Sequence, residues 1–168
     1  MPAHALDIGL VSVLAVCVVT DVRRGRIPNA ITYPVMAFGL TVAASGPLGF
    51  RAAVEGLMAG AAVMYVGFAL GAIGAGNIKL MAAVGALKGP SFVVTALFCS
   101  VLLGGVWAGL VLVCSGQARG VLSDVAKVFS RANPQSEIIP PRGGALPFSL
   151  AIGVGTVTTL MLEWRLDL

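Results

Sequence analysis

Two short polar stretches in this otherwise apolar chain have residues that could carry out chemistry. The first is Asp21-Val-Arg-Arg-Gly-Arg-Ile-Pro-Asn29, in which a carboxylate precedes an Ile-Pro-Asn triplet. The second is Gly71-Ala-Ile-Gly-Ala-Gly-Asn-Ile-Lys79, in which glycines precede an amide and an ammonium group. A carboxylate can exchange a proton, an amide can donate and accept hydrogen bonds, and glycine lets an extended peptide approach the backbone closely. These residues are therefore the first candidates for a functional site.

Each stretch also has an ordinary structural interpretation. Asp21 could form an ion pair with Arg24 or another arginine at the end of a helix. Asn77 could be the N-cap of the following helix, with Lys79 extending its ammonium group toward water. Taken separately, neither stretch shows whether its role is structural or functional. The choice depends on which elements carry the two stretches and where those elements lie.

The composition excludes a soluble enzyme. Of the 168 residues, 58% are hydrophobic and only 11% are charged, whereas soluble domains carry about 25% charged residues. The net charge of +4 does not indicate nucleic-acid binding, because the basic residues are scattered through short loops between apolar runs. We therefore expect one integral-membrane domain over residues 1–168, with lipids as partners and no nucleic acid.

Six apolar segments predict an all-α bundle of about six transmembrane helices. The segments are residues 6–20, 30–45, 52–73, 78–87, 91–114 and 146–163. Because a crossing needs about 20 residues, the first helix must continue through Asp21 and end at the break formed by Ile27-Pro-Asn29. Asp21 then lies at the membrane edge or just inside it, where an ionised carboxylate is costly and is by default functional.

The distribution of basic residues predicts the orientation of these helices. If the short fourth segment crosses the membrane, most lysines and arginines share one side, and the N-terminus lies outside. The cytoplasmic set is then Arg23, Arg24, Arg26, Lys79, Arg119, Lys127, Arg131 and Arg142, and only Arg51, Lys88 and Arg165 lie on the other side. Both polar stretches would face the cytoplasm at the same depth.

One long polar stretch, residues 115–145, predicts a cytoplasmic loop. Apolar residues recur at helical spacing over 119–131 with charged residues between them, which indicates an amphipathic helix on the membrane surface. Cys17, Cys99 and Cys114 lie inside apolar runs and form no C-x-x-C pair. We therefore expect no disulfide framework, metal site or cofactor.

Over essentially its whole length the chain resembles the type IV prepilin peptidases, in particular the small members that serve Flp pili. Asp21 followed after five residues by Ile27-Pro28-Asn29 is similar to the first signature of that family. Gly74-Ala-Gly76-Asn77-Ile-Lys79 is similar to the second signature, GxGD followed by a basic residue, except at the aspartate. Pro147 and the phenylalanine after it resemble the opening of the family's last helix.

The resemblance implies a multi-pass GxGD-type intramembrane aspartyl endopeptidase of the bacterial inner membrane. Its substrate would be a prepilin, with a short basic leader that ends in glycine and a hydrophobic helix that stays in the membrane. Two carboxylates close together in a low-dielectric site have separated pKa values, so the pair holds one proton over a useful pH range. Asp21 corresponds to one of the two, and the implied substrate-site residues are Ile27, Pro28, Asn29, Gly74, Gly76, Lys79 and Pro147.

The second catalytic position holds Asn77 instead of aspartate. Asparagine keeps the size and hydrogen bonding of aspartic acid but cannot exchange a proton at neutral pH, so we expect this chain to be inactive. Asn77 is either a substitution introduced into an active peptidase or the natural residue of an inactive homologue that acts as a membrane scaffold or binding subunit. A small transporter would also use glycine-broken helices, although the internal repeat typical of many transporters is not seen.

Overall fold

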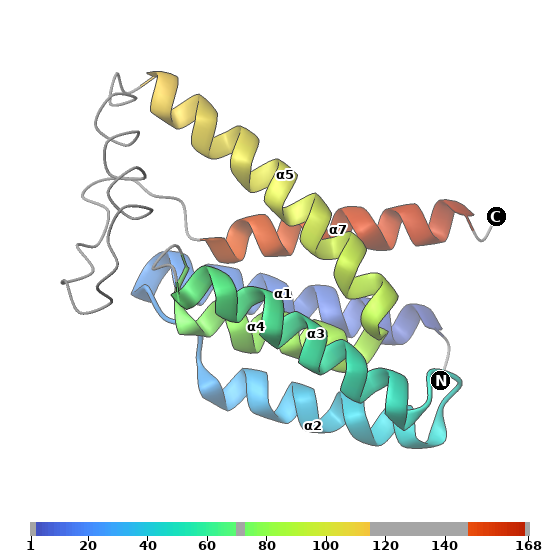
Figure 1. Ribbon diagram of the computed structural model, residues 1–168. Helices are drawn as coiled ribbons and strands as arrows, with labels where there is room; N and C mark the ends of the chain where they lie inside the picture. Colours follow the sequence, from blue (N-terminus) through green and yellow to red (C-terminus); the bar gives the residue numbers. More distant parts are fainter. Residues whose placement is uncertain (1–2, 70–72, 115–147, 167–168) are drawn as a thin grey trace.

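The computed structural model describes residues 3–69, 73–114 and 148–166 (Figure 1). Within these ranges the chain forms six α-helices and no strand, which confirms the predicted all-α class. The helices are α1 (Ala3–Arg24), α2 (Asn29–Ser45), α3 (Phe50–Ala69), α4 (Ala75–Lys88), α5 (Pro90–Cys114) and α7 (Phe148–Leu166). The predicted loop at 115–145, with its amphipathic helix, and Pro147 lie outside the described residues.

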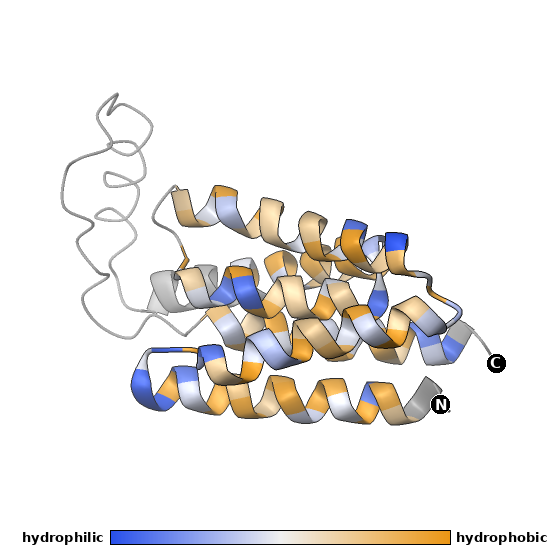
Figure 2. Ribbon diagram, turned by 90° about the horizontal axis from the view of Figure 1, so that it is seen from below, coloured by the Kyte–Doolittle hydropathy of each residue, from blue (hydrophilic) through white to orange (hydrophobic). Residues whose placement is uncertain are grey.

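Two of the described helices have the length and composition needed to cross a membrane. They are Ala5–Arg24 in α1 and Phe50–Ala69 in α3, and Pro90–Val106 in α5 is a shorter apolar helical segment. Large hydrophobic side chains such as Phe98, Met58 and Met161 are exposed on the outer faces. Figure 2 shows hydrophobic residues along every helix and hydrophilic residues mainly near helix ends.

Helix α4 is the central element of the bundle, because its neighbours cover it on several sides. It packs mainly against α3 and α2, and it also contacts α5, α7 and α1. Its buried residues are Asn77, Leu80, Met81, Ala82, Ala83, Val84, Gly85 and Ala86. A helix buried on all sides needs no separate polar face, which explains why α4 is apolar without a clear amphipathic pattern.

Glycine allows α3 and α4 to pack with their backbones in contact. A Cβ atom added to Gly85 would overlap the backbone of Gly56, and one added to Gly60 would lie 2.6 Å from the carbonyl oxygen of Met81. On the α2 side, a Cβ at Gly39 would lie 2.9 Å from the Ala86 carbonyl carbon. Small residues at such crossings let helices approach more closely than larger side chains permit.

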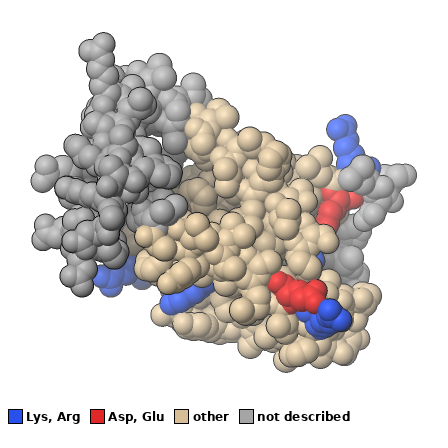
Figure 3. All heavy atoms as spheres, in the orientation of Figure 1, with Lys and Arg blue, Asp and Glu red and all other residues tan. Residues whose placement is uncertain are grey.

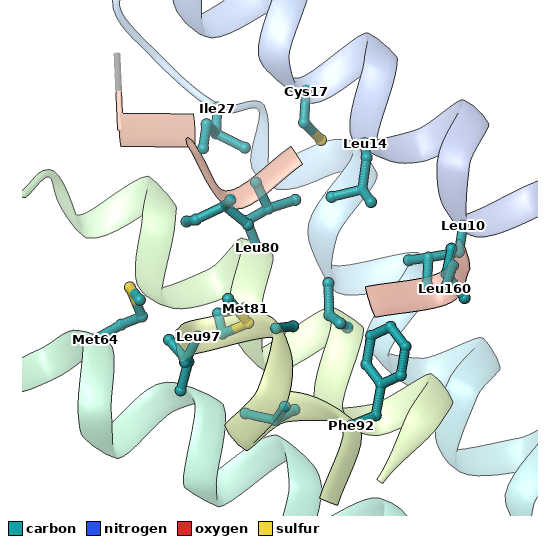
Figure 4. Close-up of a cluster of buried hydrophobic side chains, with 14 residues drawn as sticks. Leu10, Leu14, Cys17, Ile27, Met64, Leu80, Met81, Phe92, Leu97 and Leu160 are labelled. Carbon is teal, nitrogen blue, oxygen red and sulfur yellow. The ribbon is translucent and has the colours of Figure 1, made fainter. Parts of the chain in front are cut away.

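The hydrophobic core connects α1 to α4, α5 and α7. Figure 4 shows its side chains, which include Leu10, Leu14, Cys17, Leu80, Met81, Phe92, Leu97 and Leu160. All of these are at least nine-tenths buried. The predicted role of Cys17 as a small packing residue is consistent with this position, and both Cys17 and Cys99 are free thiols.

Candidate active site

The end of α1 places Asp21 on the last turn of the helix. Gly25 has a positive φ of 62°, a conformation that glycine adopts readily, and its N–H donates to the Asp21 carbonyl oxygen at 2.7 Å. This arrangement ends α1 at Arg24, about one turn after Asp21. The predicted continuation of the helix through Asp21 is therefore correct.

The break between α1 and α2 lies slightly earlier than the sequence predicted. Pro28 is the N-cap of α2, with φ −67° and ψ 126°, and Asn29 is already the first helical residue. The connection consists of the residues from Gly25 to Pro28 rather than the Ile27-Pro-Asn29 triplet. Glycine in the left-handed conformation ends α1 before the proline is reached, because Gly25 closes the last turn through its own hydrogen bond.

The start of α4 determines the surroundings of Asn77. Gly74 is extended, with φ −79° and ψ 153°, and it is the N-cap of α4 without a side-chain hydrogen bond. Asn77 is the third helical residue, and its N–H donates to the Gly74 carbonyl oxygen at 3.0 Å. The interpretation of Asn77 as the N-cap is therefore wrong.

The side chain of Asn77 is buried without a full set of partners. The residue is 5% exposed, and no group in the described part of the chain donates a hydrogen bond to its Oδ1 atom. A buried acceptor without a partner costs about 1–3 kcal/mol of folding free energy. Such a group is expected where a ligand supplies the missing hydrogen bond.

Asp21 and Asn77 line the same pocket, which has a volume of about 280 Å³. The lining is formed by Asp21, Gly25, Arg26, Ile27, Asn29, Gly74, Ala75, Gly76, Asn77 and Lys79. Six of the seven candidate substrate residues are described, and five of them belong to this set. Pro28 is half-buried next to the pocket but does not line it, and Pro147 lies outside the described residues.

Two direct contacts hold the two polar stretches together. Lys79 donates from Nζ to Asn29 Oδ1 at 2.7 Å, and the same ammonium group lies 5.3 Å from the ring centroid of Tyr33. A Cβ added to Gly76 would lie 3.0 Å from the Ile27 Cβ atom. Lys79 therefore connects α4 to α2. This role could not be predicted from the sequence, because Asn29 is fifty residues away.

The carboxylate of Asp21 is available for chemistry. It is half-buried at the pocket wall, and within residues 3–69, 73–114 and 148–166 the ion pairs involve other acidic groups. The interpretation of Asp21 as the partner of Arg24 therefore has no support in the described contacts. Asp21 can exchange a proton with a ligand or water, whereas Asn77 can only donate and accept hydrogen bonds.

The two long apolar helices point to a membrane-associated protein, and the polar pocket lies between the ends of two of its helices. The sequence model of the type IV leader peptidase family matches residues 8–109, a range that includes both polar stretches. The chain therefore belongs to the type IV leader peptidase family, which supports a leader-peptidase-like function and implies a prepilin substrate. No curated protein and no solved structure matches the chain.

Proposed function

We propose that this chain has the architecture of an intramembrane aspartyl endopeptidase that removes prepilin leaders, and that Asn77 makes it inactive. The observation that carries the proposal is the shared pocket of Asp21 and Asn77. In an active form, one ionised carboxylate takes a proton from water while its protonated partner hydrogen-bonds the scissile carbonyl and then protonates the leaving nitrogen. Position 77 would supply the second of these carboxylates.

Asn77 affects catalysis more than binding. Its amide can donate to a substrate carbonyl and accept from a peptide N–H, so a leader peptide can still occupy the pocket. General acid–base catalysis contributes typically about 10²–10⁴-fold in rate, and a site with one carboxylate loses this contribution. We therefore expect substrate binding without cleavage.

In the proposed arrangement all six helices cross the bacterial inner membrane, with the N-terminus outside and the pocket at the cytoplasmic face. The fourteen residues of α4 extend about 21 Å at 1.5 Å per residue, which is less than a hydrocarbon core of about 30 Å. Neighbouring helices bury the middle of α4, and local thinning of the bilayer can accommodate the difference in length.

The pocket wall suggests how an extended leader is held. Gly74 and Ala75 are exposed at the pocket, which leaves the backbone before α4 open to a peptide strand. Ile27 from the α1–α2 connection and Asn29 from the start of α2 also line the pocket. We propose that these residues, together with Pro28, Gly76, Lys79 and Pro147, position the leader glycine beside Asp21.

The decisive experiment restores the missing carboxylate. Purified chains with Asn77 and with Asn77→Asp are incubated with a prepilin-like substrate, and cleavage is followed on a gel. We expect cleavage after the leader glycine only with Asn77→Asp, and we expect Asp21→Asn to abolish it again. Asn29→Asp, which adds a carboxylate to the same pocket at another position, is the matched control and should not cleave.

A second function, a binding subunit without catalysis, is favoured by Asn77 itself. A chain that evolved to bind prepilin or to act as a scaffold has no requirement for a second carboxylate. If Asn77→Asp folds, binds the substrate and still does not cleave it, the binding function replaces the peptidase. If the Asn77 chain cleaves at full rate, the assignment of position 77 is wrong.

A further inference from the structure

A second polar cluster lies at the end of the bundle opposite the pocket. Lys88, the last residue of α4, places its Nζ atom 2.7 Å from Asp7 Oδ1 of α1 and 3.1 Å from Glu163 Oε2 of α7. Trp164 donates from Nε1 to Asp7 Oδ2 at 2.9 Å. We call Asp7, Lys88, Glu163 and Trp164 the far-end cluster. It connects three helices, and the sequence patterns gave no indication of it.

The Asp7–Lys88 pair is the most buried part of the far-end cluster. The side chains of Asp7 and Lys88 are 4% and 20% exposed, and that of Glu163 is 43% exposed. The Lys88–Asp7 contact is a short, largely buried ion pair. Removing one partner of a buried pair leaves an uncompensated charge and is strongly destabilising.

An exposed ion pair on α3 provides a contrast. Arg51 and Glu55 lie four residues apart on the first turns of α3, with side chains 92% and 51% exposed. Such surface pairs contribute about 0–1 kcal/mol. Figure 3 shows acidic side chains on the visible face gathered at one end of the molecule, with basic ones close by. The Arg51–Glu55 pair is therefore a matched control for the far-end cluster.

The far-end cluster and the pocket lie at opposite ends of the same two helices. Asp7 and Asp21 are separated by about 21 Å along α1, and Asn77 and Lys88 by about 17 Å along α4, at 1.5 Å per residue. Because α1 runs toward the pocket and α4 runs away from it, the Asp7–Lys88 pair joins the helices at one end and the pocket separates them at the other.

In the described part of the chain, the Asp7–Lys88 contact is the ion pair between α1 and α4. The two helices share only a small direct contact, and α4 packs mainly against α3 and α2. Gly56, Gly60 and Gly39 bring the backbones of α3 and α2 against α4, so these contacts hold α4 within the α2–α3–α4 unit. The small α1–α4 contact leaves room for translations of about 1–2 Å between α1 and that unit, of the size that helices undergo at interfaces.

We propose that the far-end cluster is a positioning device, in which the Asp7–Lys88 pair fixes the axial register of α4 and so sets the distance between Asp21 and residue 77. Lys88 is a positioning residue that acts through α4 on the opposite end of the helix. Specification of register is the best-supported use of buried polar groups. The catalytic consequence of this inference rests on the proposed function, but the geometric consequence does not.

The geometric test measures a distance across the pocket end in the chain with Asn77. Nitroxide labels are attached to Arg24→Cys and Ala75→Cys, after replacement of Cys17, Cys99 and Cys114 by alanine, and the spin–spin distance distribution is recorded. We expect Lys88→Met to shift or broaden it by about 1–2 Å, and Lys88→Arg and Arg51→Met to leave it unchanged. An unchanged distribution in folded Lys88→Met overturns the inference, as does an equal change in Lys88→Arg.

A kinetic arm in the unlabelled Asn77→Asp chain separates the inference from the proposed function. A displacement of about 1 Å in an active site can reduce the rate about 10²-fold, so Lys88→Met should lower kcat by this factor with little change in KM, and Lys88→Arg should retain activity. If Asn77→Asp does not cleave at all, the proposed function fails while the distance measurement still decides the inference. If Lys88→Met does not fold, Asp7→Asn in the same labelled chain takes its place, where a shifted or broadened distribution supports the inference and an unchanged one overturns it.

Discussion

At the scale of a single residue, Asn77 lowers the stability of the fold while it provides a polar group for binding. Asn77 is almost completely buried, and its Oδ1 atom accepts no hydrogen bond from the described residues. Proteins commonly accept such a cost at sites that bind a ligand, and substitutions that remove it raise stability while function is lost. This Oδ1 atom can accept a hydrogen bond from a peptide N–H.

We therefore expect Asn77→Leu to stabilise the fold. The substitution removes an unpartnered acceptor that costs about 1–3 kcal/mol, and the adjoining pocket leaves space for the larger side chain. Thermal unfolding in detergent should show an increased unfolding free energy of about 1 kcal/mol, and substrate binding should be lost. A lower unfolding temperature for Asn77→Leu would show that Asn77 is already well satisfied.

Lys79 and Asn29 form a second testable pair. Their hydrogen bond of 2.7 Å is exposed to solvent, so we expect a coupling free energy of only about 0.5–1 kcal/mol. A double-mutant cycle with Lys79→Met and Asn29→Ala, measured by unfolding, should show this coupling. Strict additivity of the two substitutions would indicate that the contact does not hold the two helices together.

At the scale of the elements, close packing of α3 against α4 determines where α4 lies in the bundle. Gly56 and Gly85 bring the two backbones together, and the position of α4 depends on this contact. Because α4 carries both Asn77 and Lys79, a change in its distance from α3 moves one wall of the pocket.

The glycine contact leads to a prediction with an internal control. Gly85→Ala should lower the unfolding free energy by about 1–3 kcal/mol, because overpacking forces the helices apart. Gly105→Ala in α5, where an added Cβ meets nothing within 4 Å, should instead stabilise the helix by about 0.5–1 kcal/mol. Equal effects of the two substitutions, measured by thermal unfolding, would contradict the proposed role of the contact.

The helices could be predicted from local sequence, whereas the contacts between them could not. Apolar segments bounded by Gly25, Pro28 and the glycines before Asn77 were sufficient to locate each helix, because helix ends depend on neighbouring residues. The pairing of Lys79 with Asn29 and of Lys88 with Asp7 depends on how the helices pack, and these partners are far apart in the chain. Scattered charges in an apolar chain gave no indication of which ones would meet.

The orientation of the whole molecule in the membrane can be tested by chemical labelling. If the six helices cross with the N-terminus outside, Arg51→Cys should react with an impermeant maleimide in intact cells. Arg26→Cys, at the opposite end of the bundle, should react only after the cells are permeabilised. The reverse pattern would invert the topology, and labelling of both positions in intact cells would contradict a fixed orientation.

The order in which the helices are synthesised gives the burial of α4 a consequence for biogenesis. The ribosome completes α4 before α7 exists, and domains begin to form from the N-terminus during synthesis. In the proposed membrane arrangement, a segment of fourteen residues is too short to enter a bilayer readily on its own, but α2 and α3, which make most of its contacts, are already complete. Lys88 has Asp7 as a partner from the start and receives Glu163 only when α7 has been made. A chain whose translation stops before α7 should therefore keep α4 against α3, while the far-end cluster stays incomplete and open to quality-control proteases.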